Sequence, residues 1–314
     1  MPDAAEECPF CEGREDRTPP EAWADRHEGG DVDGPGWRVR SVPNLFPVLD
    51  RTQHAASSMQ EKGLSSAVDP LADSRRTGDP DLFASQPAEG SHEVIVATPR
   101  HETSLAGLGA DELAVLLDSW RERMRVVGDD ASYVHLIVNE GPLAGASLEH
   151  THAQLYGLRF VPAEIARERE RASAYHQRTM GSHLLGDVAT EEVRRRERLV
   201  AIDDETVLLC PWASRGPFEL RIVPRRPAPS FEAEGEAGAA MLGTALRALT
   251  GVFGALPQFN LWIRTAPRGA EEFCWHLDLL PRLTIRAGFE LGTGVDINTY
   301  APERAASDLR EALN

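Results

Sequence analysis

The stretch YVHLIVNEGPLAGASLEHTHAQ, residues 133–154, decides the fold of this 314-residue chain. Its first residues are mostly β-branched or apolar and predict a strand, which a glycine-rich segment follows. A second strand then carries His150, His152 and Gln154 at alternate positions. Because residues i and i+2 of a strand face the same side of a sheet, we expect these three polar side chains to project from one face.

An internal repeat surrounds this stretch. The first unit also contains a strand over 92–97 and a helix whose apolar residues, from Leu113 to Met124, recur every three or four positions. The second unit repeats the order of strand, helix, strand and strand over 218–223, 236–253, 259–264 and 273–280. The duplication implies that both halves form the same kind of structure.

We therefore predict an α+β fold of two tandem repeats, mainly antiparallel sheet with helices packed on it. The N-terminal half covers residues 1–163 and the C-terminal half covers residues 164–314. Residues 51–91 are rich in Ser, Ala, Asp, Pro and Gly and have no apolar periodicity. This composition predicts a long surface loop within the first half.

The composition also limits the class of protein. Hydrophobic and charged residues make up 41% and 26% of the chain, as in a soluble globular protein. The net charge of −17 argues against a nucleic-acid partner, because a phosphate backbone needs a basic surface. No apolar run approaches the roughly 20 residues of a membrane-spanning helix, and the N-terminus does not resemble a signal peptide. Four cysteines are too few for a disulfide scaffold, so we expect a cytoplasmic protein.

The motif Cys8-Pro9-Phe10-Cys11 indicates a metal site. A Cys-x-x-Cys turn aims two thiolates at one point, and Zn²⁺ takes about four sulfur or nitrogen ligands in a tetrahedron. Because the chain has one such pair, His150 and His101 are the candidates for the remaining ligands. Zinc in such a closed site would be structural. A redox pair and an incidental pair near the chain end are the alternatives, although the βαβ setting of a thioredoxin-like motif is absent.

His152 is the candidate nucleophile. If His150 binds zinc, His152 stays available on the same face, where a neutral imidazole can attack phosphorus and hold it as a phosphoramidate. Gln154 can donate an amide hydrogen to the phosphate oxygens as charge develops. Ser147 and the backbone amides of the glycine-rich segment can cradle the rest of the phosphate. The alternative interpretation is a strand whose polar face meets water.

Together these motifs resemble the galactose-1-phosphate uridylyltransferase family, the transferase branch of the histidine triad superfamily. The resemblance runs over nearly the whole chain and implies two histidine-triad-like halves and a homodimer with shared active sites. The further motifs that carry it are Pro43-Asn44-Leu45-Phe46-Pro47, Pro99-Arg100-His101, Pro217-Phe218-Glu219, Trp275-His276-Leu277-Asp278-Leu279-Leu280-Pro281-Arg282 and Gly288-Phe289-Glu290-Leu291-Gly292-Thr293-Gly294.

The resemblance also implies a role for each matching position. His152 is similar to the nucleophile that becomes nucleotidylated, with Gln154 and Ser147 as phosphate contacts. The positions that look like the zinc ligands are Cys8, Cys11, His101 and His150. The positions that look like the nucleotide pocket are Asn44, Phe46 and Asn139. The positions that look like sugar-phosphate contacts, reaching in from the partner subunit, are Phe289 and Glu290.

Several positions depart from the family's pattern. The best-known members have proline where Thr151 stands, and a small polar residue there is similar to relatives that act on ADP-sugars. Leu45 stands where strict uridylyl members place an acidic residue near the ribose. The family's N-terminal arginine-bearing segment has no counterpart, so either Arg38 or Arg100 replaces it or the substrate differs. Some members hold a second metal, but a second metal is not expected here, because the matching positions are Glu168, Arg264, His276 and Asp278.

The predicted function is ping-pong nucleotidyl transfer. His152 takes a nucleoside monophosphate from a nucleotide sugar, and a sugar 1-phosphate accepts it, in galactose or related carbohydrate metabolism. The second hypothesis is a phosphorylase or adenylyltransferase that acts on ADP-sugars or dinucleoside polyphosphates. The third is a catalytically weak nucleotide-binding protein. The sequence leaves open the choice between uridine and adenine nucleotides, and the acceptor.

Overall fold

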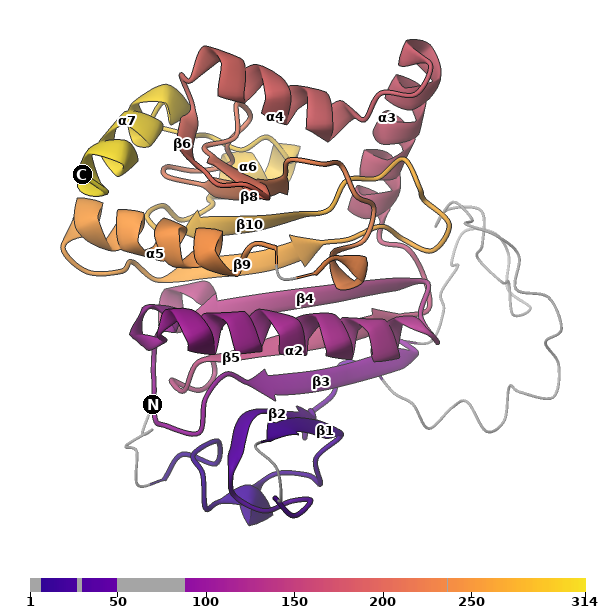
Figure 1. The fold of residues 1–314 in the computed structure, drawn as a ribbon, viewed down its shortest axis with the longest axis vertical. Helices are drawn as coiled ribbons and strands as arrows, with labels where there is room; N and C mark the ends of the chain where they lie inside the picture. Colours follow the sequence, from indigo (N-terminus) through magenta and orange to yellow (C-terminus); the bar gives the residue numbers. More distant parts are fainter. Residues whose placement is uncertain (1–6, 27–29, 50–87, 236) are drawn as a thin grey trace, which may run out of the picture.

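The computed structural model describes residues 7–26, 30–49, 88–235 and 237–314. These residues form one ten-stranded antiparallel sheet with the order β1-β2-β3-β5-β4-β9-β10-β8-β7-β6 (Figure 1). In chain order the strands are β1 (Trp23–Arg26), β2 (Trp37–Pro43), β3 (Gly90–Val96), β4 (Tyr133–Glu140), β5 (His152–Leu158), β6 (Leu199–Ile202), β7 (Thr206–Leu209), β8 (Leu220–Pro224), β9 (Phe259–Arg264) and β10 (His276–Pro281). The predicted α+β fold on antiparallel sheet is confirmed.

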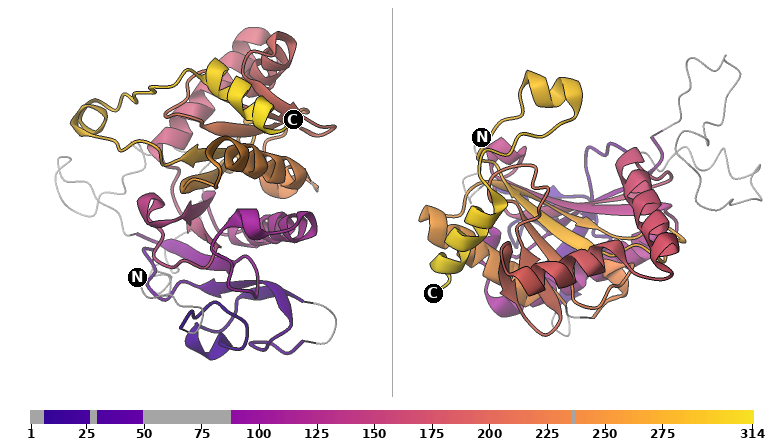
Figure 2. Two further views of the ribbon diagram at one scale, coloured as in Figure 1. Left: turned by 90° about the vertical axis from the view of Figure 1, so that its left-hand side faces the viewer. Right: turned by 90° about the horizontal axis from the view of Figure 1, so that it is seen from above.

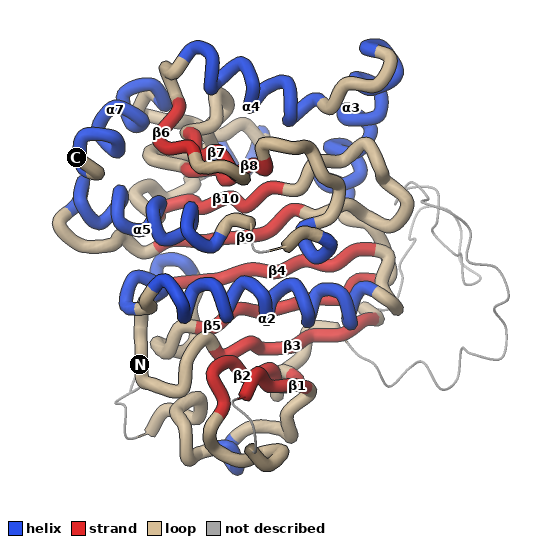
Figure 3. The backbone as a smooth tube through the Cα atoms, viewed as in Figure 1, coloured by secondary structure: helices blue, strands red, loops and turns tan. Residues whose placement is uncertain are grey.

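Helices lie on both faces of this sheet (Figure 3). Within the described residues the α-helices are α2 (Ala110–Gly128), α3 (Ala163–Thr179), α4 (Leu184–Arg195), α5 (Ala239–Phe253), α6 (Gly288–Thr293) and α7 (Pro302–Ala312). Figure 1 shows α2 and α5 side by side in front of the central strands, one for each repeat. None of the helices in the described ranges is long and apolar enough to cross a membrane.

The main core lies between the sheet and the helices α2, α5 and α7. In α2 the apolar stripe that the sequence predicted is buried, with Leu116, Leu117 and Trp120 all at 0% exposure. This stripe packs on inward-facing residues of the central strands, including Leu136 and Leu155. Each fully buried side chain of this kind contributes about 1.5–3 kcal/mol, so the core holds the central strands rigidly.

On the opposite face of the sheet, α3 packs on Tyr133 of β4, and two further clusters lie near the ends of the sheet. At one end, Cys8 and Phe10 of the N-terminal segment pack on β2 and β3. At the other end, α4 packs on β7 and β8. Between them lie β5, β4, β9 and β10, whose register aligns Gln154, Ile137, Trp262 and Asp278 in one row across the sheet. This middle stretch carries the polar residues singled out in the sequence.

The strands and helices of both repeats lie close to their predicted positions, with a few differences. His150 precedes β5 and is not part of it, because the Thr151 N–H donates to the Glu102 carbonyl instead of joining the ladder. Residues 51–87 of the predicted loop 51–91 lie outside the described residues, and its last two residues begin β3. Sequence patterns did not predict β1, β2, β6, β7, α3, α4, α6 or α7.

Candidate active site

Four possible metal ligands come together next to the point where β3 ends and β5 begins, namely Cys8, Cys11, His101 and His150. Their ligand atoms all lie within 4.8 Å of one another, the arrangement expected of a site that could hold a metal ion such as zinc. Cys8 Sγ lies 3.5 Å from His150 Nδ1, and Cys11 Sγ lies 3.4 Å from His101 Nδ1. Zn–S and Zn–N bonds of normal length in a tetrahedron place sulfur and nitrogen about 3.5 Å apart. The residues therefore fit zinc in both donor set and spacing.

His150 is held in the form that a metal ligand requires. Its Nε2 lies 2.9 Å from the Thr98 carbonyl oxygen, so Nε2 carries the proton and donates it. Nδ1, which faces the two thiol groups, is consequently the unprotonated nitrogen. A carbonyl that fixes the tautomer in this way is the usual support of a metal-bound histidine.

His152 is oriented by the same segment. Its Nδ1 lies 2.8 Å from the His150 carbonyl oxygen and donates a hydrogen bond to it, so Nε2 carries the lone pair. The Phe10 ring of the Cys-x-x-Cys turn packs edge-on against His152, with 5.3 Å between ring centroids. The four side chains that could hold a metal and the candidate nucleophile are therefore directly connected. The backbone of His150 and the Phe10 ring fix the orientation of the His152 imidazole.

Gln154 is fixed by two neighbours on the same face. The Tyr156 hydroxyl donates to Gln154 Oε1 at 2.8 Å, and His92 Nε2 lies 3.1 Å from the same oxygen. The Val48 N–H donates to His92 Nδ1, and Asn44 Nδ2 lies 3.1 Å from His92 Nε2. Burial lowers the pKa of His92, while the bond to Gln154 acts in the opposite direction. With Oε1 engaged, the Nε2 amide of Gln154 is the end that can donate to a ligand.

Asn139 follows the last residue of β4 that pairs with β5, and Ser147 lies in the glycine-rich segment that leads to His152. Asn260 Nδ2 donates to both Asn139 Oδ1 and the Ala144 carbonyl, which fixes the orientation of the two amides and leaves Asn139 Nδ2 for a ligand. The turn between them begins at Gly141, where φ is +86° and a Cβ would meet the side chain of Gln258. Ser147 is exposed beyond this turn.

The remaining predicted contacts divide into two groups. Asn44 Nδ2 lies 3.1 Å from His92 Nε2, and Phe46, whose N–H donates to Asn44 Oδ1, is 82% exposed. Phe289 and Glu290 lie on α6, in a segment that projects away from the body of the molecule (Figure 2). The structure of one chain therefore does not bring α6 to His152.

Arg38 and Arg100 were the predicted replacements for the family's N-terminal arginines. Arg38 donates to both carboxylate oxygens of Asp25, and Arg100 donates to both of Glu112. Both guanidinium groups are therefore engaged in bidentate ion pairs in this structure.

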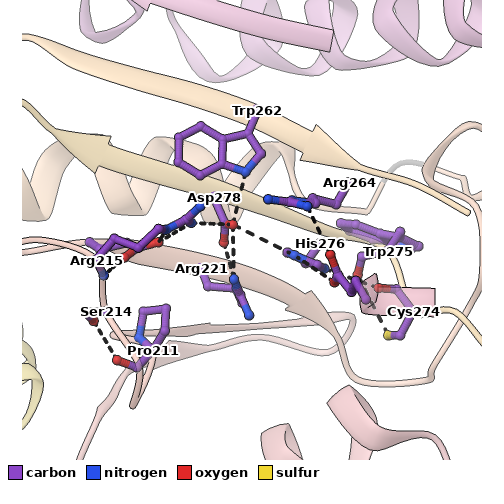
Figure 4. Close-up of polar contacts among 12 residues, drawn as sticks. Pro211, Ser214, Arg215, Arg221, Trp262, Arg264, Cys274, Trp275, His276 and Asp278 are labelled. Carbon is purple, nitrogen blue, oxygen red and sulfur yellow. Dashed lines mark hydrogen bonds and ion pairs between the residues drawn. The ribbon is translucent and has the colours of Figure 1, made fainter. Parts of the chain in front are cut away.

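The sequence singled out Asp278 but not its partners in a second polar cluster, which is formed by β8, β9, β10 and the segment before β8 (Figure 4). The fully buried Asp278 carboxylate accepts hydrogen bonds from Arg215, Arg221 and the Trp262 indole, at 2.6–3.1 Å. Burial alone would raise the pKa of Asp278, but Arg221, His276 and Arg215 together outweigh it and hold that pKa below its usual range. The arginine partners could not be found from sequence, because the contacts depend on the register between three strands.

The four positions that correspond to a second metal do not fit one. The Arg264 guanidinium donates to Glu168 at 3.1 Å, which places a positive charge among the would-be ligands. The oxygens of Asp278 are occupied by the donors just described. Burial lowers the pKa of His276 to about 4, and its Nδ1 lies 3.2 Å from the Cys274 carbonyl, the same arrangement as His152 with His150. His276 is the first residue of β10, as His152 is of β5, and its side chain is 1% exposed.

Comparisons with known proteins agree with this site. Residues 50–162 match the family model described as galactose-1-phosphate uridyl transferase, N-terminal domain. An ADP-glucose phosphorylase of Arabidopsis thaliana is 27% identical over 97% of this chain and 81% of that protein. A galactose-1-phosphate uridylyltransferase of Cryptococcus neoformans is 32% identical over 78% of this chain and 71% of that protein.

The solved structures that resemble this chain include the same two kinds of enzyme. The crystal structure of an ADP-glucose phosphorylase from Arabidopsis thaliana with bound ADP-glucose has a TM-score of 0.80 at 25% identity, covering 99% of this chain and 91% of that chain. A uridylyltransferase structure has a TM-score of 0.79 at 25% identity, covering 100% of this chain and 92% of that chain.

The duplicated sheet and the His-x-His-x-Gln segment define an enzyme of the transferase branch of the histidine triad superfamily. The chain belongs to the galactose-1-phosphate uridylyltransferase family, as its motifs predicted. The relatives divide between uridylyltransferases and an ADP-glucose phosphorylase.

Proposed function

We propose that this enzyme transfers a nucleoside monophosphate from a nucleotide sugar to a phosphate-bearing acceptor through a covalent bond to His152. The observation that carries the proposal is the orientation of His152. Its Nδ1–H is bound to the His150 carbonyl, so Nε2 is the nucleophilic nitrogen on the polar face of the sheet. The amides of Gln154 and Asn139 lie on the same face and supply donors for phosphate oxygens.

The reaction follows in two balanced steps. In the first, the lone pair of His152 Nε2 forms a bond to the α-phosphorus, and the bond from that phosphorus to the bridging oxygen breaks. The electron pair leaves with the bridging oxygen as sugar 1-phosphate. In the second, an acceptor phosphate oxygen attacks the same phosphorus, and the electron pair of the P–N bond returns to Nε2.

Zinc held by Cys8, Cys11, His101 and His150 would brace this site. It would supply a closed structural centre that holds the His150 segment, whose carbonyl orients His152. We assign Asn44, Phe46, Asn139 and Ser147 to the nucleotide and its phosphates. This assignment rests on their positions beside His92, His152 and the Gly141 turn.

The proposal is tested with a donor alone. Incubating the pure protein with UDP-glucose or with ADP-glucose, without acceptor, is expected to raise its intact mass by one nucleotidyl group. Peptide mapping should place the group on His152. The donor that labels faster identifies the base. If neither nucleotide sugar nor a dinucleoside polyphosphate labels the protein, the proposal is wrong.

Inorganic phosphate is the second candidate acceptor. The ADP-glucose phosphorylase matches over 97% of this chain, a larger share than the 78% matched by the Cryptococcus uridylyltransferase. Thr151 also favours this candidate, because a small polar residue at that position is similar to relatives that act on ADP-sugars. Adding phosphate to the labelled enzyme would then release nucleoside diphosphate, whereas a sugar 1-phosphate would release a nucleotide sugar. Comparing the two discharge rates decides between the acceptors.

We further propose a homodimer that shares its active sites through the segment around α6. This segment exposes apolar side chains, with Ile285 82%, Leu291 73% and Phe289 54% exposed. An exposed apolar cluster of this kind marks an interaction surface. It follows β10, whose last residues lie at the edge of the sheet where β5 begins with His152. In the dimer, Phe289 and Glu290 would contact the sugar phosphate bound to the other chain.

Sedimentation velocity is expected to give twice the 34.4 kDa mass of one chain. Ile285→Glu should shift the protein toward monomers, because it places a charge in the apolar surface, while Ile202→Glu, at another exposed isoleucine, should not. A wild-type protein that sediments only as a monomer at micromolar concentration would contradict the shared site.

A further inference from the structure

The carboxylate of Glu140 is buried at the end of β4, at the edge of the sheet where β5 begins. Glu140 is 8% exposed, and a glutamate at that depth needs partners. Its carboxylate accepts hydrogen bonds from the Ser104 hydroxyl at 2.6 Å and from the Leu105 N–H at 2.9 Å. The proposed mechanism does not use Glu140, although this residue lies between Asn139 and the Gly141 turn.

The ionised form of Glu140 costs the protein stability. Both groups that contact the carboxylate are uncharged, and burial raises the pKa of Glu140 to about 7 although its two hydrogen bonds act in the opposite direction. A carboxyl group whose pKa is raised on folding destabilises the native state as the pH rises from its unfolded pKa of 4.5 through about 7. A buried charge that lowers stability favours a functional role over a structural one.

The loop of residues 97–104, which follows β3, holds the segment in front of the nucleophile. The Thr98 carbonyl accepts a hydrogen bond from His150 Nε2 at 2.9 Å. The Glu102 carbonyl accepts the Thr151 N–H at 2.7 Å. The loop therefore contacts both residues that directly precede the nucleophile in the chain.

The same loop carries a metal ligand, and Glu140 fixes its far end. His101 lies in the middle of the loop and belongs to the cluster that fits zinc. The loop ends at Ser104, and Leu105 begins the short 3-10 helix η2 (Leu105–Gly107). Without the Glu140 carboxylate, the buried Leu105 N–H would lose its acceptor and the loop could shift against β4.

We propose that Glu140 is a positioning residue that acts through the 97–104 loop on the metal site and on His152. Its carboxylate fixes the end of the loop, the loop fixes His150, and the His150 carbonyl orients His152 Nδ1. The link to His152 rests on the proposed function, whereas the link to the metal site does not. Groups that orient metal ligands from behind change metal affinity or activity by about 10- to 100-fold when they are removed.

Two rates measured on the full-length, zinc-loaded protein test this role. Single-turnover labelling by a nucleotide sugar gives a maximal rate and a half-saturating donor concentration, and excess EDTA gives the rate of zinc release. Glu140→Ala is expected to label about tenfold more slowly at saturation, with the half-saturating concentration unchanged, and to release zinc about tenfold faster. Glu140→Gln should recover part of both rates, because its amide oxygen still accepts one hydrogen bond.

Stability separates positioning from a purely structural role. At pH 8, Glu140→Gln should have a Tm at least equal to that of wild type, because it removes an ionised carboxylate that burial disfavours. Glu192→Ala is the matched control. Glu192 is also buried, at 3% exposure, and accepts a hydrogen bond from Arg198 Nε at 2.8 Å on α4. Its loss should lower the Tm and leave both rates as in wild type.

The outcomes distinguish this inference from the proposed function. If no donor labels wild type, the covalent mechanism fails, and zinc release alone decides the role of Glu140. If Glu140→Ala releases zinc and labels as wild type does, or if only its half-saturating donor concentration rises, Glu140 is not a positioning residue. Should Glu140→Ala fail to fold, Ser104→Ala removes one of the two donors and is expected to show a smaller change of the same kind.

Discussion

Replacing His152 by alanine will abolish both turnover and covalent labelling by a nucleotide sugar. Alanine removes the only nitrogen that the proposed mechanism uses as nucleophile, and the second step has no other route. Loss of an essential nucleophile lowers kcat by roughly 10⁴- to 10⁶-fold. Intact-mass spectrometry after incubation with donor should show no adduct, and a coupled assay should show only background release of sugar 1-phosphate.

The variant is expected to fold normally. Removing the His152 imidazole takes away its hydrogen bond to the His150 carbonyl and leaves a small void at the edge of the sheet. We expect the free energy of unfolding to fall by about 1–2 kcal/mol. His176→Ala on α3 is the matched control and should retain full labelling. Adduct formation in His152→Ala would disprove the assignment. Tight nucleotide binding by wild type and variant alike, without turnover by either, would instead establish a binding protein.

The sequence predicted the central part of the fold well, because its elements have strong local signals. The apolar stripe of α2 and the β-branched and apolar residues of β4 are strong local signals, and both elements appear within a few residues of their expected limits. The metal cluster could also be predicted, since Cys8 and Cys11 are near in sequence and thiolates in that spacing have few uses. The elements that were missed are short or polar, such as β1 and α3.

The rest of the site depends on contacts between distant strands. The sequence of the Cys-x-x-Cys turn does not predict that Phe10 packs on His152. The sequence of β8 does not predict that Arg221 faces Asp278 of β10. Such pairs follow from register, which is set by the whole sheet and not by local propensity.

Replacing Cys8 by serine is expected to remove the metal and to destabilise the protein strongly. Cys8 is fully buried, and its thiol group lies against His150 in the cluster. A metal present at about a thousand times its dissociation constant stabilises the folded state by about 4 kcal/mol. Its loss should lower the Tm by roughly 10 °C. Atomic emission should find about one zinc per chain in wild type and much less in Cys8→Ser, and calorimetry should show the shift in Tm.

Cys274→Ser separates the loss of a ligand from the loss of a buried thiol. Cys274 is also buried but lies outside the cluster, so this variant should keep its zinc and lose only a little stability. Because the His150 carbonyl orients His152, Cys8→Ser should also label more slowly with donor, even at temperatures where it remains folded. A Cys8→Ser protein that retains zinc, Tm and labelling rate would show that the cluster braces neither the fold nor the nucleophile.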